Sequence, residues 1–154
     1  MKTHHYSTQL QWTGNRGSGT KSYTSYTRDY NIQTEGKPVV LGSSDPAFRG
    51  DSSRYNPEEM LLASLSSCHM LWYLHLCSEA GVIVTAYKDN AIGEMEETLN
   101  GSGRFVKVIL RPVVTVQEES MLNKANELHQ KANEMCFIAN SCNFPVLHEP
   151  ESKI

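Results

Sequence analysis

The chain has 154 residues, of which 20 % are charged, and a formal net charge of −3 at neutral pH. This length suits one domain that buries a core without disulfide staples. The slightly acidic balance provides no basic surface for nucleic acid. No segment approaches the ~20 consecutive apolar residues that cross a bilayer, so we expect no membrane partner.

The first residues, MKTHHYSTQLQW, lack the apolar core of a secretory signal. The sequence therefore predicts a cytoplasmic protein in a reducing compartment. Cysteines in such a compartment are more often reactive, metal-binding or simply buried than permanently cross-linked.

The first third of the chain predicts strands and loops. Residues 6–32 interleave polar with aromatic and β-branched side chains around a glycine-rich stretch at 13–19, which is typical of two strands and a loop. Residues 35–38 predict a turn into a further strand at 39–41. The next stretch, GSSDPAFRGDSSRYN, has no hydrophobic period and predicts a long loop.

A strong helix start follows this loop. Asn56 suits the N-cap, Pro57 the first helical position and Glu59 the third, where it can close a capping box. Capping accounts for both Glu58 and Glu59 on composition alone. Apolar residues recur at helical spacing up to Gly81, and they occur round much of the helix, so we expect burial on more than one side.

The second half of the chain predicts strands, a helix and a final strand. Residues 82–87, 91–97 and 103–117 suit strands, the last of them long, and a helix follows from about residue 118. This helix delivers Cys136 at or just beyond its end. Residues 144–148 suit a short strand. The order of elements predicts a single α+β domain over residues 1–154.

The cysteines and histidines do not suggest a metal centre. Cys68 and His75 are two helical turns apart, ~10 Å along the axis, which is too far to hold one zinc ion tetrahedrally. We therefore expect no metal and no other cofactor. A helical cysteine on an apolar face is usually a small buried hydrophobe, and we favour this interpretation for Cys77 and Cys142.

A reactive Cys68 needs help from outside its own helix. A thiolate forms beside a cation or a hydrogen-bond donor, and Cys68 lies about three turns beyond the helix start, where the dipole has faded. Arg16, Arg49 and Arg54 are candidate cations in loops. Glu58 lies ten residues before Cys68, ~15 Å away along a continuous helix. A site that contains both residues must therefore take Glu58 from a second subunit.

Three segments carry a family resemblance: WTGNRGSGT, SSDPAFRGDSSRYNPEEMLLASLSSCHM and CFIANSCNFPV. Together they resemble the OsmC/Ohr family of thiol-dependent hydroperoxide reductases, in particular its OsmC-like peroxiredoxin branch. The resemblance implies an α+β, OsmC-like fold, in which extended antiparallel sheets surround long central helices. It also implies an intertwined homodimer with active sites at the subunit interface.

The same resemblance implies roles for individual residues. Cys68 matches the peroxidatic cysteine and Cys136 the resolving cysteine. Glu58 matches the carboxylate that orients the active-site arginine. Arg16 matches that arginine by its place in the glycine-rich turn, with Arg49 and Arg54 as alternatives. Separately, Cys142 stands where the family pattern favours an apolar residue such as Val, and its role stays open.

The implied activity is the reduction of organic hydroperoxides, with hydrogen peroxide as a further candidate substrate. Cys68 would become a sulfenic acid, Cys136 would condense with it to a disulfide, and an external dithiol would restore both thiols. Two other classes remain. One is a non-enzymatic redox sensor that uses the same two cysteines, and the other is a structural or ligand-binding dimer in which the thiols are incidental.

Overall fold

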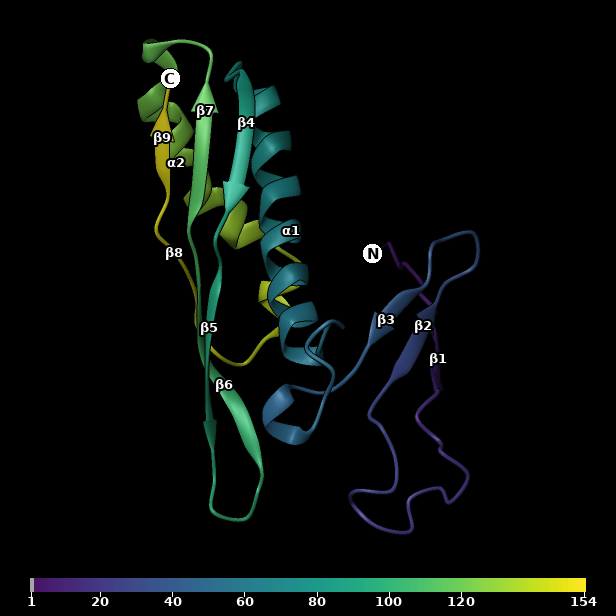
Figure 1. Cartoon of the computed structure of the whole chain (residues 1–154). Helices are drawn as coiled ribbons and strands as arrows, with labels where there is room; N and C mark the ends of the chain where they lie inside the picture. The colour runs from purple at the N-terminus through teal and green to yellow at the C-terminus, as the bar shows by residue number, and fades with distance from the viewer. Residues whose placement is uncertain (1) are drawn as a thin grey trace. The chain divides into compact units, whose positions relative to one another are not determined.

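A computed structural model describes residues 2–154. Its contacts divide the chain into two compact units, Met1–Met60 and Leu61–Ile154 (Figure 1). The first unit contains the elements β1 (Gln9–Trp12), β2 (Tyr30–Gln33), β3 (Val40–Gly42), the 3-10 helix η1 (Pro46–Phe48) and the start of α1 (Pro57–Glu79).

The first unit is built on an antiparallel sheet in the order β1-β2-β3. Its register pairs Gln9 with Gln33 and Tyr30 with Gly42. Gly36, at φ +73°, adopts the left-handed conformation that the turn before β3 requires. These are the strands and the turn that the sequence predicts.

Polar bonds hold the long loop between β3 and α1. The buried Ser43 donates through Oγ to Asp29 Oδ1 at 3.1 Å. Ser43 Oγ also accepts a hydrogen bond from Asp51 N at 3.1 Å. Arg54 Nε lies 4.0 Å from a carboxylate oxygen of Asp29 and 3.7 Å from one of Asp51. The loop therefore has a defined shape without an apolar core of its own.

Helix α1 begins as predicted. Asn56 Oδ1 accepts from Glu59 N at 2.8 Å, and Glu59 Oε2 accepts from Asn56 N at 3.1 Å, which completes a capping box. The helix runs without a break to Glu79. It ends before Gly81, whose φ of +72° suits the left-handed position that often follows a helix.

The burial of α1 differs from the expectation. Its buried residues form a single stripe with a spacing of four: Leu65, His69, Tyr73 and Cys77. Leu71, on another side, is 64 % exposed. Within one chain the helix is thus fully buried along one side only. Other apolar residues of the helix are partly buried against the two apolar clusters: Leu61, Leu62, Trp72, Leu74 and Leu76.

By length and composition, α1 is also apolar enough to cross a membrane, with a mean hydropathy of 1.2 over 18 residues. This corrects the expectation that no segment approaches that limit. The difference arises because the leucine, methionine and cysteine residues of the helix raise the average enough to offset its serine, histidine and aromatic residues. A core helix passes the same test, so the observation decides nothing about membranes.

The second unit contains two sheets, with strand orders β4-β7-β9 and β5-β6-β8 (Figure 1). Their antiparallel pairs are β4 with β7 and β5 with β6. Each sheet also gains one parallel strand, because β8 pairs with β6 and β9 with β7. The strands are β4 (Val84–Asp89), β5 (Ile92–Glu97), β6 (Gly103–Leu110), β7 (Pro112–Val116), β8 (Val146–His148) and β9 (Glu151–Lys153).

The long strand expected at 103–117 is wrong, because the structure divides it into β6 and β7. At the break, Arg111 N donates to Asp89 Oδ1 at 2.6 Å and Arg111 O accepts from Asn90 N at 3.4 Å. The next residue, Pro112, has no N–H for the ladder. The chain therefore steps from one sheet to the other at this point.

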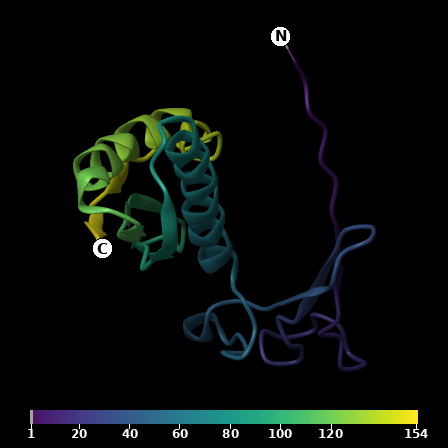
Figure 2. The same cartoon turned by 90° about the horizontal axis from the view of Figure 1, so that it is seen from above.

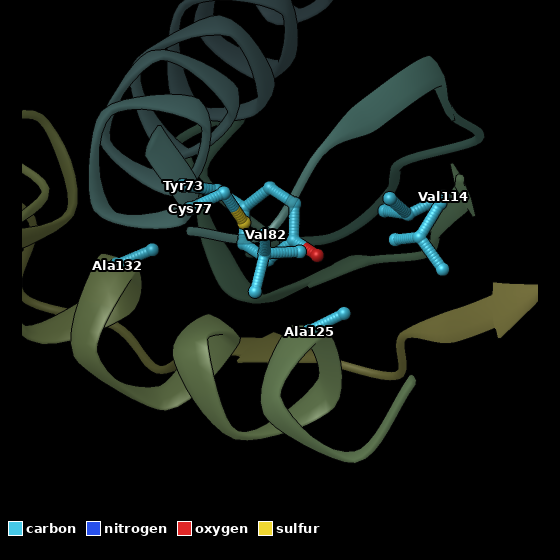
Figure 3. Packing of buried hydrophobic residues seen from close by; sticks show 7 residues of the cluster. Tyr73, Cys77, Val82, Val114, Ala125 and Ala132 are labelled. Carbon is cyan, nitrogen blue, oxygen red and sulfur yellow. The ribbon is translucent and has the colours of Figure 1, made fainter. Parts of the chain in front are cut away.

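Both helices pack against these sheets, as Figure 2 shows from above. In Figure 3, Ala125 and Ala132 point from α2 towards Tyr73 and Cys77 of α1, with Val82 between them. A second apolar cluster joins α1 to β6. The elements between β7 and β8 are η2 (Glu119–Met121), α2 (Leu122–Met135) and η3 (Ala139–Ser141).

Candidate functional site

Helix α1 carries a second stripe beside its core stripe. Cys68, Leu71, Trp72 and His75 have the spacing i, i+3, i+4 and i+7 and so share one face. With Phe137 they line a cavity of about 320 Å³. The rings of Trp72 and Phe137 meet edge to face, with centroids 5.6 Å apart and planes at 83°. The half-buried Cys68 thiol therefore belongs to an apolar cavity of a size that suits a small ligand.

The second thiol lies next to the first. Cys136 follows α2 directly and is 1 % exposed, and its Sγ accepts a hydrogen bond from Ala139 N at 3.4 Å. Cys68 is close enough to this sulfur to affect its pKa. Burial first, and then the neighbouring Cys68, raise the pKa of Cys136 to about 11. Cys136 is therefore a protonated thiol at neutral pH.

Both of these cysteines are free thiols in the structure. The sequence places them 68 positions apart, on two different helical segments, and the fold brings them together. The two thiols and the apolar cavity all belong to the second unit.

The other two cysteines are structural in character. Cys77 is buried in the core with Tyr73, and burial raises the pKa of its thiol, which confirms its interpretation as a buried hydrophobe. The half-buried Cys142 donates through Sγ to Ile138 O at 3.3 Å. It packs against the cluster around Leu65, and burial raises its pKa as well.

Glu58 lies in the first turn of α1 and is half-buried. Capping does not explain it, because the reciprocal bonds with Asn56 belong to Glu59. The expectation that capping accounts for both glutamates is therefore wrong for Glu58. Burial, and then the charge of Glu58, raise the pKa of the Tyr30 phenol.

The three candidate arginines have different surroundings. Arg16 is exposed in a turn shaped by Asn15, whose Oδ1 accepts from the backbone N–H groups of Gly17 and Gly19. Arg49 is exposed and has a left-handed backbone, with φ 65°. Arg54 is engaged by the carboxylates of the loop before α1. All three arginines and Glu58 belong to the first unit, whereas both thiols belong to the second.

A buried histidine pair joins α1, which carries Cys68, to α2, which directly precedes Cys136. His69 Nε2 and His129 Nδ1 are 3.0 Å apart, and Tyr73 stacks on the ring of His129 at 3.8 Å. Burial lowers the pKa of His69 to about 4 and that of His129 to about 3. The sequence was compatible with either a solvent-facing His129 or a His129 that makes a hydrogen bond in the core. In the structure His129 is buried and makes the core hydrogen bond.

The core role of His69 was missed from the sequence, although its spacing of four from Leu65 and Tyr73 is a signal that could have identified a core histidine. His148 lies close to the pair, with its ring centroid 5.8 Å from that of His69. Even so, no group of three His, Cys, Asp or Glu side chains within residues 2–154 is arranged to hold a metal ion.

The family model for OsmC-like proteins matches residues 50–150. The chain belongs to the OsmC-like family. A solved OsmC-like protein of unknown function from Vibrio cholerae is 30 % identical, with 96 % of this chain and 99 % of that chain covered and a TM-score of 0.85. The resemblance inferred from the sequence motifs is thereby confirmed, together with the α+β, OsmC-like fold.

More distant solved structures share this fold. An organic hydroperoxide resistance protein from Elizabethkingia anophelis is 18 % identical, with 99 % of this chain and 100 % of that chain covered and a TM-score of 0.72. The uncharacterized protein YmaD of Bacillus subtilis is 24 % identical over 92 % of this chain and 88 % of its own length.

Proposed function

We propose that this OsmC-like protein is a thiol-dependent peroxidase that reduces organic hydroperoxides, with hydrogen peroxide as a second substrate. The observation that carries the proposal is the meeting of Cys68 and Cys136 at an apolar cavity. The family relationship supports it, because organic hydroperoxide resistance proteins share the fold. Two neighbouring thiols alone would suit a protein core equally well, but Cys68 also lines the cavity.

In the first step, the Cys68 thiolate attacks the distal oxygen of the hydroperoxide. The S–O bond forms as the O–O bond breaks, and the alkoxide leaves and takes up a proton to become the alcohol. Cys68 is thereby oxidised to a sulfenic acid. The apolar walls formed by Leu71, Trp72 and Phe137 hold the organic part of the substrate.

In the second step, the sulfur of Cys136 attacks the sulfenic sulfur of Cys68. A disulfide forms, and the hydroxyl group leaves with the Cys136 proton as water. The raised pKa of Cys136 suits this order of events, because that thiol stays protonated until its partner has been oxidised. A dithiol donor then reduces the disulfide, so the electrons need no bound cofactor or metal.

The ionic part of the proposed site comes from the first unit of a second copy. Helix α1 is continuous from Pro57 to Glu79, so Glu58 and Cys68 are ~15 Å apart along it and cannot meet in one chain. We assign Glu58 of one subunit, with Arg16, to the Cys68 of the other. Arg16 stabilises the thiolate and the charge that develops on the peroxide, and Glu58 orients Arg16.

This arrangement requires a homodimer in which residues 1–154 of each chain act as one OsmC-like domain. A reducing cytoplasm, with dithiol proteins as electron donors, is the compartment that fits this chemistry.

Steady-state peroxide consumption tests the proposal. With dithiothreitol in excess, we expect many turnovers with cumene hydroperoxide and a lower kcat/KM with hydrogen peroxide. A protein that consumes one equivalent of peroxide per thiol pair and then stops would instead act as a redox sensor. No peroxide-dependent sulfenic acid or disulfide at Cys68 would leave the thiols incidental.

A further inference from the structure

One residue that lines the cavity takes no part in either step of the proposed peroxidase mechanism. Besides Cys68, His75 is the cavity-lining side chain that can take part in proton transfer. Its Nε2 lies 3.5 Å from Glu79 Oε1, and its ring meets the edge of Trp72, with centroids 5.8 Å apart and planes at 71°. Two neighbours therefore restrict the orientation of this imidazole at the cavity wall.

The position of His75 on the helix directs it towards the thiol. While Nε2 of His75 lies beside Glu79, one turn towards the helix C-terminus, its ring meets Trp72, about one turn towards the N-terminus. Cys68 lies one turn further in the same direction. A hydroperoxide bound in this cavity is then flanked by the attacking sulfur on one side and by the imidazole on the other.

The reaction needs a proton at that second position. An alkoxide is a strongly basic leaving group, so a donor that protonates it as the O–O bond breaks lowers the barrier. Cys136 keeps its proton until the later disulfide step. Leu71, Trp72 and Phe137 have no acidic proton to give.

On the basis of the proposed peroxidase function, we propose that His75 is a catalytic residue, the general acid that protonates the leaving oxygen. The Cys68 thiolate takes the distal hydroxyl group, and the imidazolium of His75 gives its proton to the departing alkoxide. The products are the sulfenic acid, the alcohol and a neutral imidazole. Because the His75 side chain is 56 % exposed, it recovers the proton from solvent.

Glu79 is a positioning residue in this scheme. Its carboxylate stabilises the imidazolium through Nε2 and so leaves Nδ1 as the nitrogen that donates the proton. Both side chains are exposed, so an ordinary surface pair at i and i+4 would look similar in a static structure. The two interpretations differ in the kind of oxidant whose reduction depends on His75.

The test compares two oxidants with different leaving groups in single-turnover reactions of the full-length protein. Cumene hydroperoxide releases a strongly basic alkoxide, whereas 3-chloroperoxybenzoic acid releases a weakly basic carboxylate that needs no acid. For His75→Gln we expect about a 100-fold or greater loss with cumene hydroperoxide. The rate with the peracid should stay near that of the parent.

Matched variants separate this role from cavity shape. Leu71→Ala changes the wall without removing a proton donor, so it should raise KM for cumene hydroperoxide and leave the ratio of the two oxidants little changed. Glu79→Gln should lower the cumene hydroperoxide rate less than His75→Gln. Added imidazole should restore part of this rate to His75→Gly.

Three results would overturn the assignment of His75: equal losses with both oxidants, no loss with either, or a His75→Gly protein that imidazole does not rescue. A parent protein that reduces neither oxidant would overturn the peroxidase proposal itself.

Discussion

The two units of this protein are stabilised in different ways. Among residues 2–60, the buried side chains are polar ones such as Ser43 and Asn56, and apolar residues of the sheet remain uncovered, with Leu10 at 63 % exposed. The second unit instead has two buried apolar clusters, one around Tyr73 and one around Leu65. Because a small sheet needs an apolar partner to be stable, we expect the first unit to be the part that depends on association.

The same difference separates the two halves of the proposed chemistry. Disulfide formation needs two sulfur atoms at a fixed separation, and both thiols lie in the unit with the packed core. We assign charge stabilisation to Arg16 and Glu58, which lie in the unit without a packed apolar core. We therefore expect substitutions in the second unit to affect the chemistry or the stability of each chain. Those in the first unit should act through the dimer.

The largest effect is expected at the thiols. Cys68→Ser should abolish peroxide consumption, whereas Cys136→Ser should complete one attack and leave a sulfenic acid on Cys68, detectable by dimedone labelling and mass spectrometry. Cys77→Ser is the matched control in the core and should retain activity. An equal loss of activity on changing Cys77 would contradict the assignment of the reactive pair.

The oxidised Cys136→Ser protein also tests Cys142. Peptide mapping that finds a disulfide between Cys68 and Cys142 would give Cys142 a rescuing role. Its absence would leave Cys142 as part of the apolar cluster that surrounds Leu65.

A pair of leucine substitutions tests the contrast in packing. Leu65→Ala should lower the free energy of unfolding by about 2–5 kcal/mol at every protein concentration, because it leaves a cavity in a closed core. Leu10→Ala should cost stability only where a second copy covers the sheet, so its effect should decrease on dilution. Urea unfolding at several concentrations measures both. A concentration-independent loss at Leu10 as large as that at Leu65 would show a core within the first unit.

Arg16 of the first unit should affect the rate of Cys68 oxidation rather than the stability of the fold. Arg16→Ala should slow the oxidation of Cys68 at neutral pH by about 10- to 100-fold, since the thiolate and the peroxide lose a stabilising cation. Stopped-flow oxidation measures this rate, and Arg49→Ala is the comparison. A fast Arg16→Ala protein together with a slow Arg49→Ala protein would transfer the role to Arg49.

A smaller effect is expected from the buried histidine pair. The folded-state pKa values of His69 and His129, about 4 and about 3, lie below the usual 6.5. The unfolded chain therefore binds protons first as the pH falls. Stability should be fully present above pH ~6.5 and should decrease as the pH falls towards ~4, where the slope levels off.

Urea midpoints between pH 7.5 and 5 follow this decrease before most carboxylates titrate. His75→Gln, which changes an exposed histidine, should keep the slope of the parent, whereas His129→Gln should reduce it. A flat profile for the parent protein would contradict the neutral, buried state of the pair.

Local signals in the sequence predicted much of this fold. Asn56, Pro57 and Glu59 predicted the start of α1, because capping depends on neighbouring residues alone. The break between β6 and β7 was missed because it depends on Asp89, from another strand. Strand β9 was missed because its sequence, ESK, has no apolar alternation and relies on pairing with β7.

The candidate site was predictable only through the family resemblance. Residue spacing gave the stripe that leads from Cys68 to His75, but the approach of Cys136 is a consequence of the packing of α2 on α1. Likewise, composition could not assign different roles to Glu58 and Glu59, because a glutamate at either position suits the first turn of a helix.

Subunit mixing is the most direct test of a site that combines the first unit of one chain with the second unit of another. Cys68→Ser and Glu58→Ala chains should each be inactive alone. After exchange, a heterodimer contains one site with Cys68 from one chain and Glu58 from the other, so an equal mixture should recover about a quarter of the parental peroxidase activity. Mixed chains that stay inactive, although mass spectrometry shows that heterodimers have formed, would contradict the shared site.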